Sequence, residues 1–202
     1  MGKRIYIFVN ILIILTGIYT LFFSGIDRGP MGAVSLLFLL IPPLAERLFR
    51  LKLGYPMKTS ILIFCLISFS LGVTLRWFNR FPGYDNFAHG LSGILFTLIG
   101  LCFYVRIGGV PDRHHQKLLQ ISFAIFFSFT IAVIWEVGEF AGFLLTGHDA
   151  QHHLDTGVFD TMEDIIACAA GSLAAALDYA IYTRKKKSLF MPIVLASDRE
   201  NQ

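Results

Sequence analysis

The chain has 202 residues, of which 55% are hydrophobic and 15% are charged, and its formal net charge is +3. Soluble domains carry about 25% charged residues, so this composition excludes an ordinary soluble enzyme and predicts an integral membrane protein. The sequence contains no basic patch with interleaved aromatic residues, so we expect no nucleic-acid partner. The three cysteines all lie in apolar runs, which predicts no disulfide framework.

Six apolar segments are long enough, or nearly so, to cross a hydrocarbon core of about 30 Å. The first directly follows MGKR and lacks a clean cleavage site, which favours an uncleaved span over a signal peptide. Pro42 and Pro43 lie inside the second segment, where we expect a kink because proline has no N–H to donate. We therefore predict an all-α integral membrane protein, a six-helix transmembrane bundle forming a single domain over 1–202 with a tail at 184–202. The predicted spans lie near 5–24, 32–49, 59–78, 86–106, 118–145 and 161–183.

The distribution of Lys and Arg predicts the orientation of these spans. With the N-terminus inside, fourteen of the 17 basic residues fall in cytoplasmic segments, and only Arg28, Arg76 and Arg80 fall outside. This asymmetry places both termini in the cytoplasm. The cytoplasmic set is Lys3, Arg4, Arg47, Arg50, Lys52, Lys58, Arg106, Arg113, Lys117, Arg184, Lys185, Lys186, Lys187 and Arg199.

With this topology, acidic residues and histidines gather at the outer membrane face. Eight of the chain's 14 acids and four of its six histidines belong to this group. They come from the start of the fourth span, the end of the fifth, the loop after it and the start of the sixth. The group is Asp85, His89, Glu136, Glu139, His148, Asp149, His152, His153, Asp155, Asp160, Glu163 and Asp164.

Several members of this group have simple structural explanations. Asp85 is at a position where it would cap its own helix, because Asp is a favoured N-cap residue. Asp160 and Glu163 form a D-x-x-E pattern that resembles a capping box. His148, His152 and His153, in the polar loop between the fifth and sixth spans, are expected to be solvated, with a ligand role as the alternative.

Four members lie a turn or more inside apolar helices, where a structural explanation is harder to find. An ionisable side chain at the centre of a membrane helix costs about 2.5–3.5 kcal/mol on insertion scales, and less near the interface. Such residues usually face the interior of the bundle and pair with one another, so a purely structural hydrogen-bond network remains an alternative. The four residues are His89, Glu136, Glu139 and Asp164.

The spacing of these residues brings oxygen and imidazole ligands together in pairs. Residues three or four apart share a helix face, and each of the last three spans offers such a pair. Two close carboxylates share a proton, pair with a protonated His89, or bind a cation. Carboxylates with an imidazole suit Mg²⁺, Mn²⁺ or Zn²⁺. The predicted cation ligands are Asp85, His89, Glu136, Glu139, Asp160 and Asp164.

Small residues predict that the fourth and sixth spans pack closely. Gly90, Gly93, Thr97 and Gly100 form a stripe at helical spacing, and ACAAGSLAAA occupies 167–176. Small residues allow membrane helices to approach each other, although they are common there for packing alone. We therefore expect both spans to be central and to bring their polar ends together.

The segments YDNFAHGLSG, WEVGEF and DTMEDIIACAAG resemble those of the YjdF-like bacterial inner-membrane proteins, and the resemblance covers most of the last three spans. More distantly, D-x-x-x-H at 85–89 and D-x-x-x-C-x-x-G at 164–171 resemble motifs of VanZ-like proteins, which are linked to glycopeptide tolerance. The VanZ-like pattern usually has Asn where this chain has Cys168. The resemblance implies a small multi-pass protein of the bacterial plasma membrane and supplies no reaction.

Three functional hypotheses follow. In the first, a divalent cation is bound at the extracytoplasmic side and the site acts on an envelope or lipid-linked substrate, with His89, Glu136 or Glu139 as general acid or base. In the second, the chain is a proton- or ion-coupled carrier, which predicts polar residues continuing towards the cytoplasmic side; Thr97 and Asp178 are the main candidates there. In the third, the polar cluster stabilises the helix packing of a structural or partner-binding membrane protein.

Overall fold

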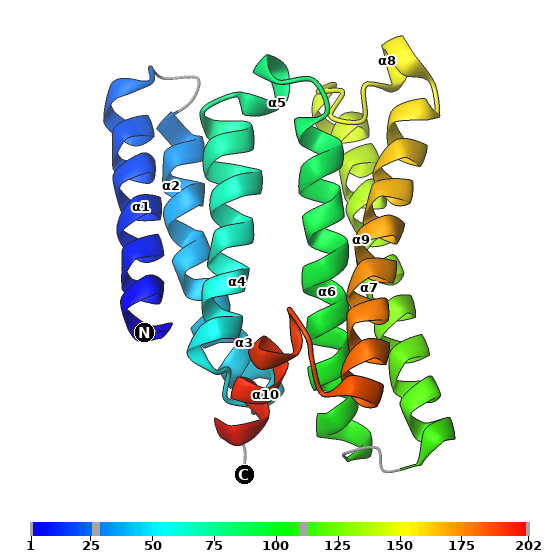
Figure 1. The fold of residues 1–202 in the computed structure, drawn as a ribbon. Coiled ribbons are helices and arrows are strands. Elements are labelled where there is room, and N and C mark those ends of the chain that lie inside the picture. Colours follow the sequence, from blue (N-terminus) through cyan, green and yellow to red (C-terminus); the bar gives the residue numbers. More distant parts are fainter. Residues whose placement is uncertain (1, 26–28, 110–112, 201–202) are drawn as a thin grey trace. The chain divides into compact units, whose positions relative to one another are not determined.

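The computed structural model describes residues 2–25, 29–109 and 113–200, and the secondary structure of these residues is helical (Figure 1). The chain divides into two compact units, Met1–Ala88 with Met191–Gln202 and His89–Phe190. The elements in chain order are α1 (Gly2–Phe23), α2 (Gly29–Leu37), η1 (Phe38–Leu40), α3 (Ile41–Phe49), α4 (Tyr55–Cys65), η2 (Leu66–Thr74), α5 (Trp77–Arg80), α6 (Tyr84–Gly108), α7 (His114–Thr146), α8 (His153–Thr156), α9 (Phe159–Lys185) and α10 (Met191–Glu200).

Six helical segments in the described part of the chain are long and apolar enough to cross a membrane, which confirms the predicted fold class. Most of their ends differ from the predicted ones by a few residues. Arg28, which was counted on the outer side, lies outside the described residues, as does the side chain of Arg199. The six segments are Gly2–Phe23, Gly29–Phe49, Tyr55–Thr74, Tyr84–Gly108, His114–Thr146 and Phe159–Lys185.

The prolines of the second span interrupt its helix as expected. The 3₁₀ segment η1 separates α2 from α3, and Pro42 and Pro43 stand at the start of α3. Proline cannot donate the N–H that would continue the i→i−4 ladder, so the turn before it tightens. The third span ends earlier than predicted, at Thr74, because Arg76 adopts a left-handed backbone with φ of 61°.

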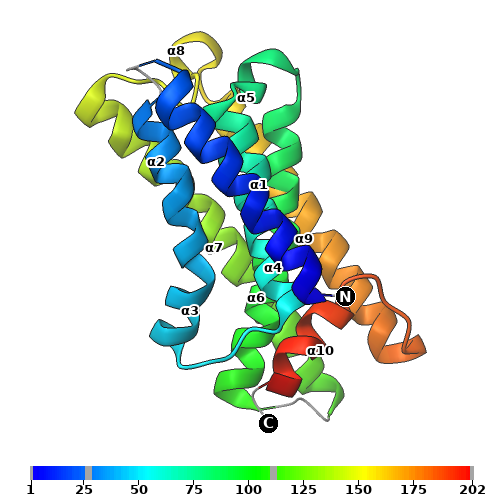
Figure 2. The ribbon, with the colours of Figure 1, turned by 90° about the vertical axis from the view of Figure 1, so that its left-hand side faces the viewer.

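In the first unit, α1 packs against α2 and α4, as the two views of Figures 1 and 2 show. Val9, Ile13 and Leu62 form one cluster of buried apolar side chains in this unit. A buried hydrogen bond of 2.7 Å joins the hydroxyls of Ser35 and Ser70, so α2 and η2 are also linked by polar groups. Apolar packing is thus the main source of cohesion in this unit.

The predicted tail contains a helix, α10, that packs on α4 within the first unit. The backbone N–H of Gly54 donates to the hydroxyl of the buried Ser197 over 3.1 Å. A side chain at Gly54 would collide with the backbone of Ala196. Glycine at this position therefore allows α10 to sit directly on the start of α4.

In the second unit, small residues bring α6, α7 and α9 close together. A Cβ atom at Gly93 would overlap the carbonyl of Cys168, and one at Gly171 would overlap the carbonyl of Gly90. On α7, the buried positions recur every four residues, which places them on one face of the helix. This face consists of Gln120, Ala124, Ser128, Ala132 and Glu136. The predicted close approach of the fourth and sixth spans is therefore present, and it sets the geometry of their polar ends.

Candidate functional site

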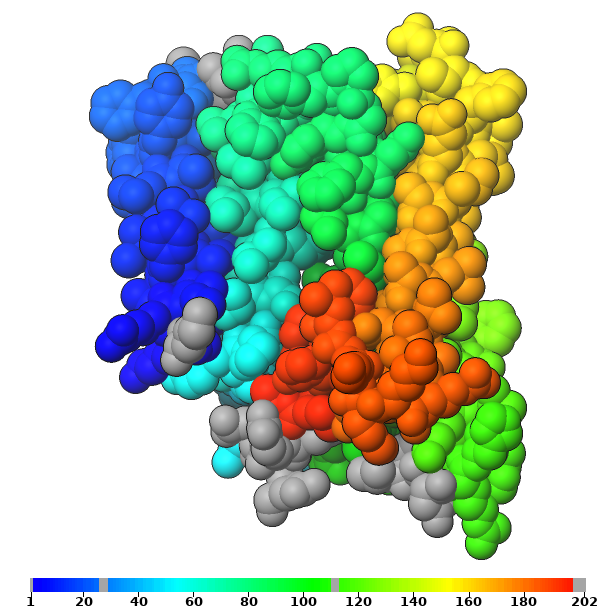
Figure 3. All heavy atoms as spheres, in the orientation of Figure 1, coloured from blue at the N-terminus to red at the C-terminus, as the bar shows by residue number. Residues whose placement is uncertain are grey.

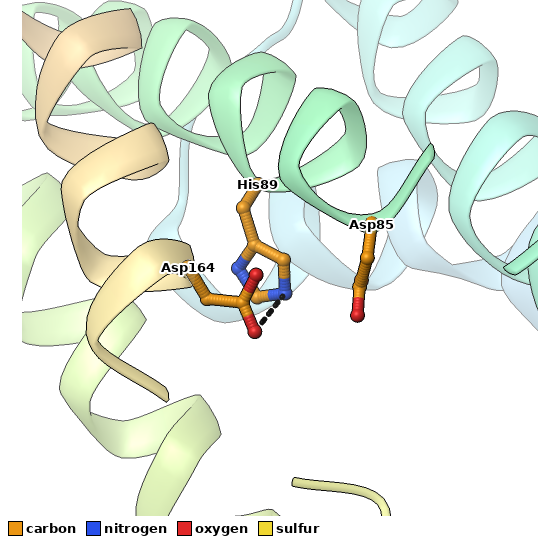
Figure 4. A group of neighbouring side chains, drawn as sticks. All are labelled: Asp85, His89 and Asp164. Atoms are coloured by element: carbon orange, nitrogen blue, oxygen red, sulfur yellow. Dashed lines mark ion pairs between the residues drawn. The ribbon is translucent and has the colours of Figure 1, made fainter. Parts of the chain in front are cut away.

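Helix α6 presents Asp85 and His89 from successive turns of the same face (Figure 4). The helix begins at Tyr84, so Asp85 lies within its first turn and is not the N-cap residue that the sequence suggested. Its carboxylate there complements the positive end of the helix dipole. His89 is one turn deeper, and 14% of its side chain is exposed.

His89 faces Asp164, which α9 contributes from its second turn (Figure 4). The His89 Nε2 and Asp164 Oδ2 atoms are 3.6 Å apart, and the Asp164 side chain is 4% exposed. One ligand atom from each of Asp85, His89 and Asp164 lies within 4.8 Å of the other two. Two of these residues come from the single helix α6, so the fold needs only the α6–α9 crossing to assemble the group.

Glu136 reaches the same region from α7 and is 6% exposed. Its Oε2 atom accepts a hydrogen bond of 2.9 Å from the side-chain amide of Gln151, which also donates to the Glu136 carbonyl over 3.0 Å. The other carboxylate oxygen, Oε1, is buried and has no hydrogen-bond partner among the residues that the structure describes. Leaving a buried charged oxygen without a donor is costly, so a ligand or proton is expected at this atom.

Asp160 lies in the first turn of α9, one turn before Asp164. The prediction that Asp160 and Glu163 form a capping box is wrong, because Val158 is the N-cap residue and no side chain caps the helix. Instead, the Oδ2 atom of Asp160 is buried, and no described residue forms a hydrogen bond with it. His89 lies within electrostatic range of both Asp160 and Glu136, so these residues belong to the same neighbourhood.

Glu139 was predicted to join the cluster, and its carboxylate contacts a neighbour on its own helix. The indole N–H of Trp135 donates to Glu139 Oε1 over 2.9 Å, one turn away on α7. Glu139 is half-buried and does not belong to the group formed by Asp85, His89 and Asp164. We name the set Asp85, His89, Glu136, Asp160 and Asp164 the acidic cluster.

The loop after α7 is held by Asp149, outside the membrane-spanning segments. Asp149 accepts hydrogen bonds from the backbone N–H groups of His153 and Leu154, and its Oδ1 lies 2.6 Å from His153 Nδ1. Partial removal from water raises the pKa of the Asp149 carboxyl, but the bonds from Leu154 and His153 outweigh this effect and lower it. His153 also packs edge-on against Phe143, so it is not a free solvated histidine. His148 and His152 are exposed as expected.

The donor set of the acidic cluster fits a divalent cation. The His89–Asp164 separation exceeds the 2.7–3.2 Å of a typical N–H···O hydrogen bond. Two ligands of one tetrahedral cation, each about 2.1 Å from it, stand about 3.4 Å apart. An imidazole with several carboxylates suits Zn²⁺ or Mn²⁺, and the predominance of oxygen ligands also suits Mg²⁺.

Sequence reasoning missed Gln151, the buried loop residue that binds Glu136. A polar residue in a polar loop gives no signal that it will fold back onto a helix. Polar contacts deeper in the second unit were also more numerous than expected. The hydroxyls of Thr97 and Ser172 are 2.7 Å apart, and the Ser128 hydroxyl donates to the Gly93 carbonyl over 3.2 Å. A four-residue spacing of polar and small residues on α7 and α9 could have revealed them.

No curated protein and no solved structure matches the chain. The resemblance to VanZ-like proteins therefore stays a prediction. A family model described as predicted membrane protein (DUF2238), the YjdF-like family, matches residues 5–185. The match spans most of the six helical segments, including every member of the acidic cluster. The chain is therefore a member of the DUF2238 family of multi-pass membrane proteins.

Proposed function

We propose that the acidic cluster binds a divalent cation on the extracytoplasmic side of a bacterial plasma membrane and acts there on an envelope or lipid-linked substrate. Asp85, His89 and Asp164 are the cation ligands closest to one another. The orientation rests on the asymmetry of Lys and Arg along the sequence. Substrates that carry phosphate or carbonyl oxygens would suit a cation that acts as a Lewis acid.

The single observation that carries this proposal is a pair of buried carboxylate oxygens, Glu136 Oε1 and Asp160 Oδ2, which have no hydrogen-bond partner in the described part of the chain. Both belong to residues within electrostatic range of His89. A network built only for stability would be expected to satisfy its buried acceptors, because each unsatisfied one is costly. A cation, or a water molecule bound to it, offers these oxygens a partner without any further protein donor.

Glu136 is the best placed general base among the three candidates. Gln151 holds one of its oxygens and leaves the other free to accept a proton from a cation-bound water. His89 serves as a ligand in this arrangement, and Glu139 is engaged by Trp135 at the half-buried edge of α7. The proposed roles therefore separate the binding of the ion from the movement of the proton.

The proposal is tested by measuring cation binding to purified protein with isothermal titration calorimetry, using Mn²⁺, Zn²⁺ and Mg²⁺ separately. We expect saturable binding of at least one ion and its loss in His89→Ala and Asp164→Asn. Glu136→Gln should weaken binding about 10–100-fold, as changes around metal ligands usually do. Glu163→Gln is the matched control, because Glu163 is an exposed carboxylate next to Asp164 on α9. Equal, weak binding by all four variants and the parent chain would refute the proposal.

An ion-coupled carrier is the second candidate, and the buried hydroxyls of the second unit favour it. Thr97 with Ser172, and Gln120 with Tyr179, continue the polar positions along α6, α7 and α9 away from the acidic cluster. The sequence predicted fewer buried polar contacts than these in the part of the second unit away from the acidic cluster. In liposomes with a trapped pH-sensitive dye, a carrier would move protons down an imposed gradient, and Thr97→Val would slow that movement. A hydrolytic site would leave the gradient unchanged.

A further inference from the structure

A second polar site lies at the other end of α7 and α9, within the second unit. A cavity of about 230 Å³ opens between the first turns of α7 and the last turns of α9. Figure 3 shows the last turns of α9, in orange, at the molecular surface. We name this cavity the basic pocket. It is lined by His114, Lys117, Leu118, Ile121, Tyr179, Ala180, Thr183 and Arg184.

The polar lining of the basic pocket favours an anion. Lys117 and Arg184 are positively charged at neutral pH, and His114 and Thr183 add further hydrogen-bond donors. Among the described residues, no carboxylate forms an ion pair with Lys117 or Arg184. Tyr179 is already engaged, since its hydroxyl donates to the side chain of Gln120. Two cations that have no ion-paired carboxylate among the described residues therefore line one cavity.

The remaining lining is apolar and continues onto the helix surface. Leu118, Ile121 and Ala180 form this part of the wall, and Leu118 is 52% exposed. Apolar side chains would contribute nothing to the binding of a free inorganic anion. A phospholipid matches it, because its phosphate meets the cations while its acyl chains lie against the apolar side chains.

The position of the pocket along the helices agrees with a lipid headgroup. Asp164 and Arg184 are 20 residues apart on α9, which corresponds to about 30 Å along the helix axis. This length is close to the thickness of a hydrocarbon core, so the pocket and the acidic cluster lie at opposite membrane faces. With the predicted orientation, the pocket lies in the cytoplasmic leaflet, where anionic lipids collect.

We infer that the basic pocket is a binding site for the phosphate headgroup of an anionic phospholipid. Lys117 and Arg184 hold the phosphate, and the wall formed by Leu118, Ile121 and Ala180 receives the first part of an acyl chain. The inference does not depend on the cation site, because the two sites share no residue. The cytoplasmic ends of α7 and α9 would therefore bind a specific class of lipid.

Native mass spectrometry of the detergent-purified chain tests the inference, with phosphatidylglycerol and phosphatidylcholine titrated in parallel. We expect phosphatidylglycerol to bind more tightly. The double variant Lys117→Gln/Arg184→Gln should lower its affinity by about fivefold for each charge and roughly 30-fold for both. The matched control is Lys185→Gln/Lys187→Gln, which removes two exposed charges next to the pocket and should change the affinity less than twofold.

A second variant and a competitor make the result decisive. Ala180→Phe fills the cavity without changing charge and should also weaken phosphatidylglycerol binding, while circular dichroism checks that all variants are folded. Inorganic phosphate at millimolar concentration should fail to displace the lipid. Full displacement by phosphate would show a simple anion site and overturn the assignment to lipid. Equal binding of both lipids, or equal losses in the pocket and control variants, would overturn it as well.

Discussion

The two ends of the second unit differ in charge and in how their polar groups are held. At one end, α7 and α9 contribute carboxylates and α6 contributes His89, and the side chains of Glu136 and Asp164 are buried. At the other end, the first turns of α7 and the last turns of α9 contribute cations to an open pocket with an apolar wall. The same two helices, α7 and α9, thus contribute residues to both the acidic cluster and the basic pocket.

This difference shows what close helix packing contributes to a polar site in a membrane. The acidic end lies next to the crossing of Gly90 and Gly171, where the backbones of α6 and α9 touch. Glu136 and Asp164 are buried at this end. Their carboxylates must therefore be satisfied by protein groups, a proton, a cation or a bound water. The basic end contains an open cavity, and its cations can contact solvent or lipid directly. Substitutions should therefore affect the two ends very differently.

The largest effect is expected for Gly171→Ala, which should lower the free energy of unfolding by about 3 kcal/mol or more. The added methyl group would overlap the Gly90 carbonyl, and backbone cannot move aside as a flexible side chain can. Gly142→Ala on α7 is the control, because nothing lies within 4 Å of its Cβ position. Thermal unfolding in detergent measures both. If Gly171→Ala were as stable as the parent chain, the close approach of α6 and α9 would not be what sets the geometry of the acidic cluster.

A smaller effect is expected for Gln151→Leu, which removes the amide that binds Glu136. Leaving the buried carboxylate without this donor should cost about 1–3 kcal/mol of stability. Lys117→Gln at the basic pocket should change stability by less than about 0.5 kcal/mol, because its side chain is only half-buried and has no ion-pair partner among the described residues. Equal losses in both variants, measured by unfolding in detergent, would contradict the proposed contrast.

The smallest effect concerns Asp149, which holds the loop beside the acidic cluster. Hydrogen bonds from Leu154 and His153 keep the pKa of this carboxyl below its ordinary value in the folded protein. Its contribution is therefore present above the unfolded pKa of about 3.9 and is lost as the pH falls through the lower folded pKa. Hydrogen exchange of the loop 149–157, corrected for intrinsic rates, should show less protection in Asp149→Asn at pH 7. The exposed Asp155→Asn serves as control, and identical exchange in the two variants would refute this role.

Much of the fold could be predicted from the sequence because membrane helices obey simple rules. Length and hydrophobicity located six spans, and Pro42 and Pro43 located the break in the second. The end of the third span was wrong because a left-handed residue, Arg76, ends it. A backbone conformation of that kind depends on local packing and has no signal in hydrophobicity.

The candidate site was predicted in part, for reasons that differ between residues. Asp85, His89 and Asp164 lie close together because four-residue spacing fixes two of them on α6 and small residues bring α9 near. Glu139 shares a helix with Glu136, but side-chain direction turns it towards Trp135. Gln151 depends on the path of a loop, which spacing rules do not describe. Whether these residues bind a cation stays a prediction.

X-ray absorption spectroscopy tests the central claim most directly, on Zn²⁺ or Mn²⁺ bound at one equivalent to the purified chain. We predict one imidazole and several oxygen ligands around the metal, with the imidazole contribution lost in His89→Ala and retained in Glu163→Gln. A metal environment without imidazole in the parent chain, or one that His89→Ala leaves unchanged, would contradict a cation site at the acidic cluster.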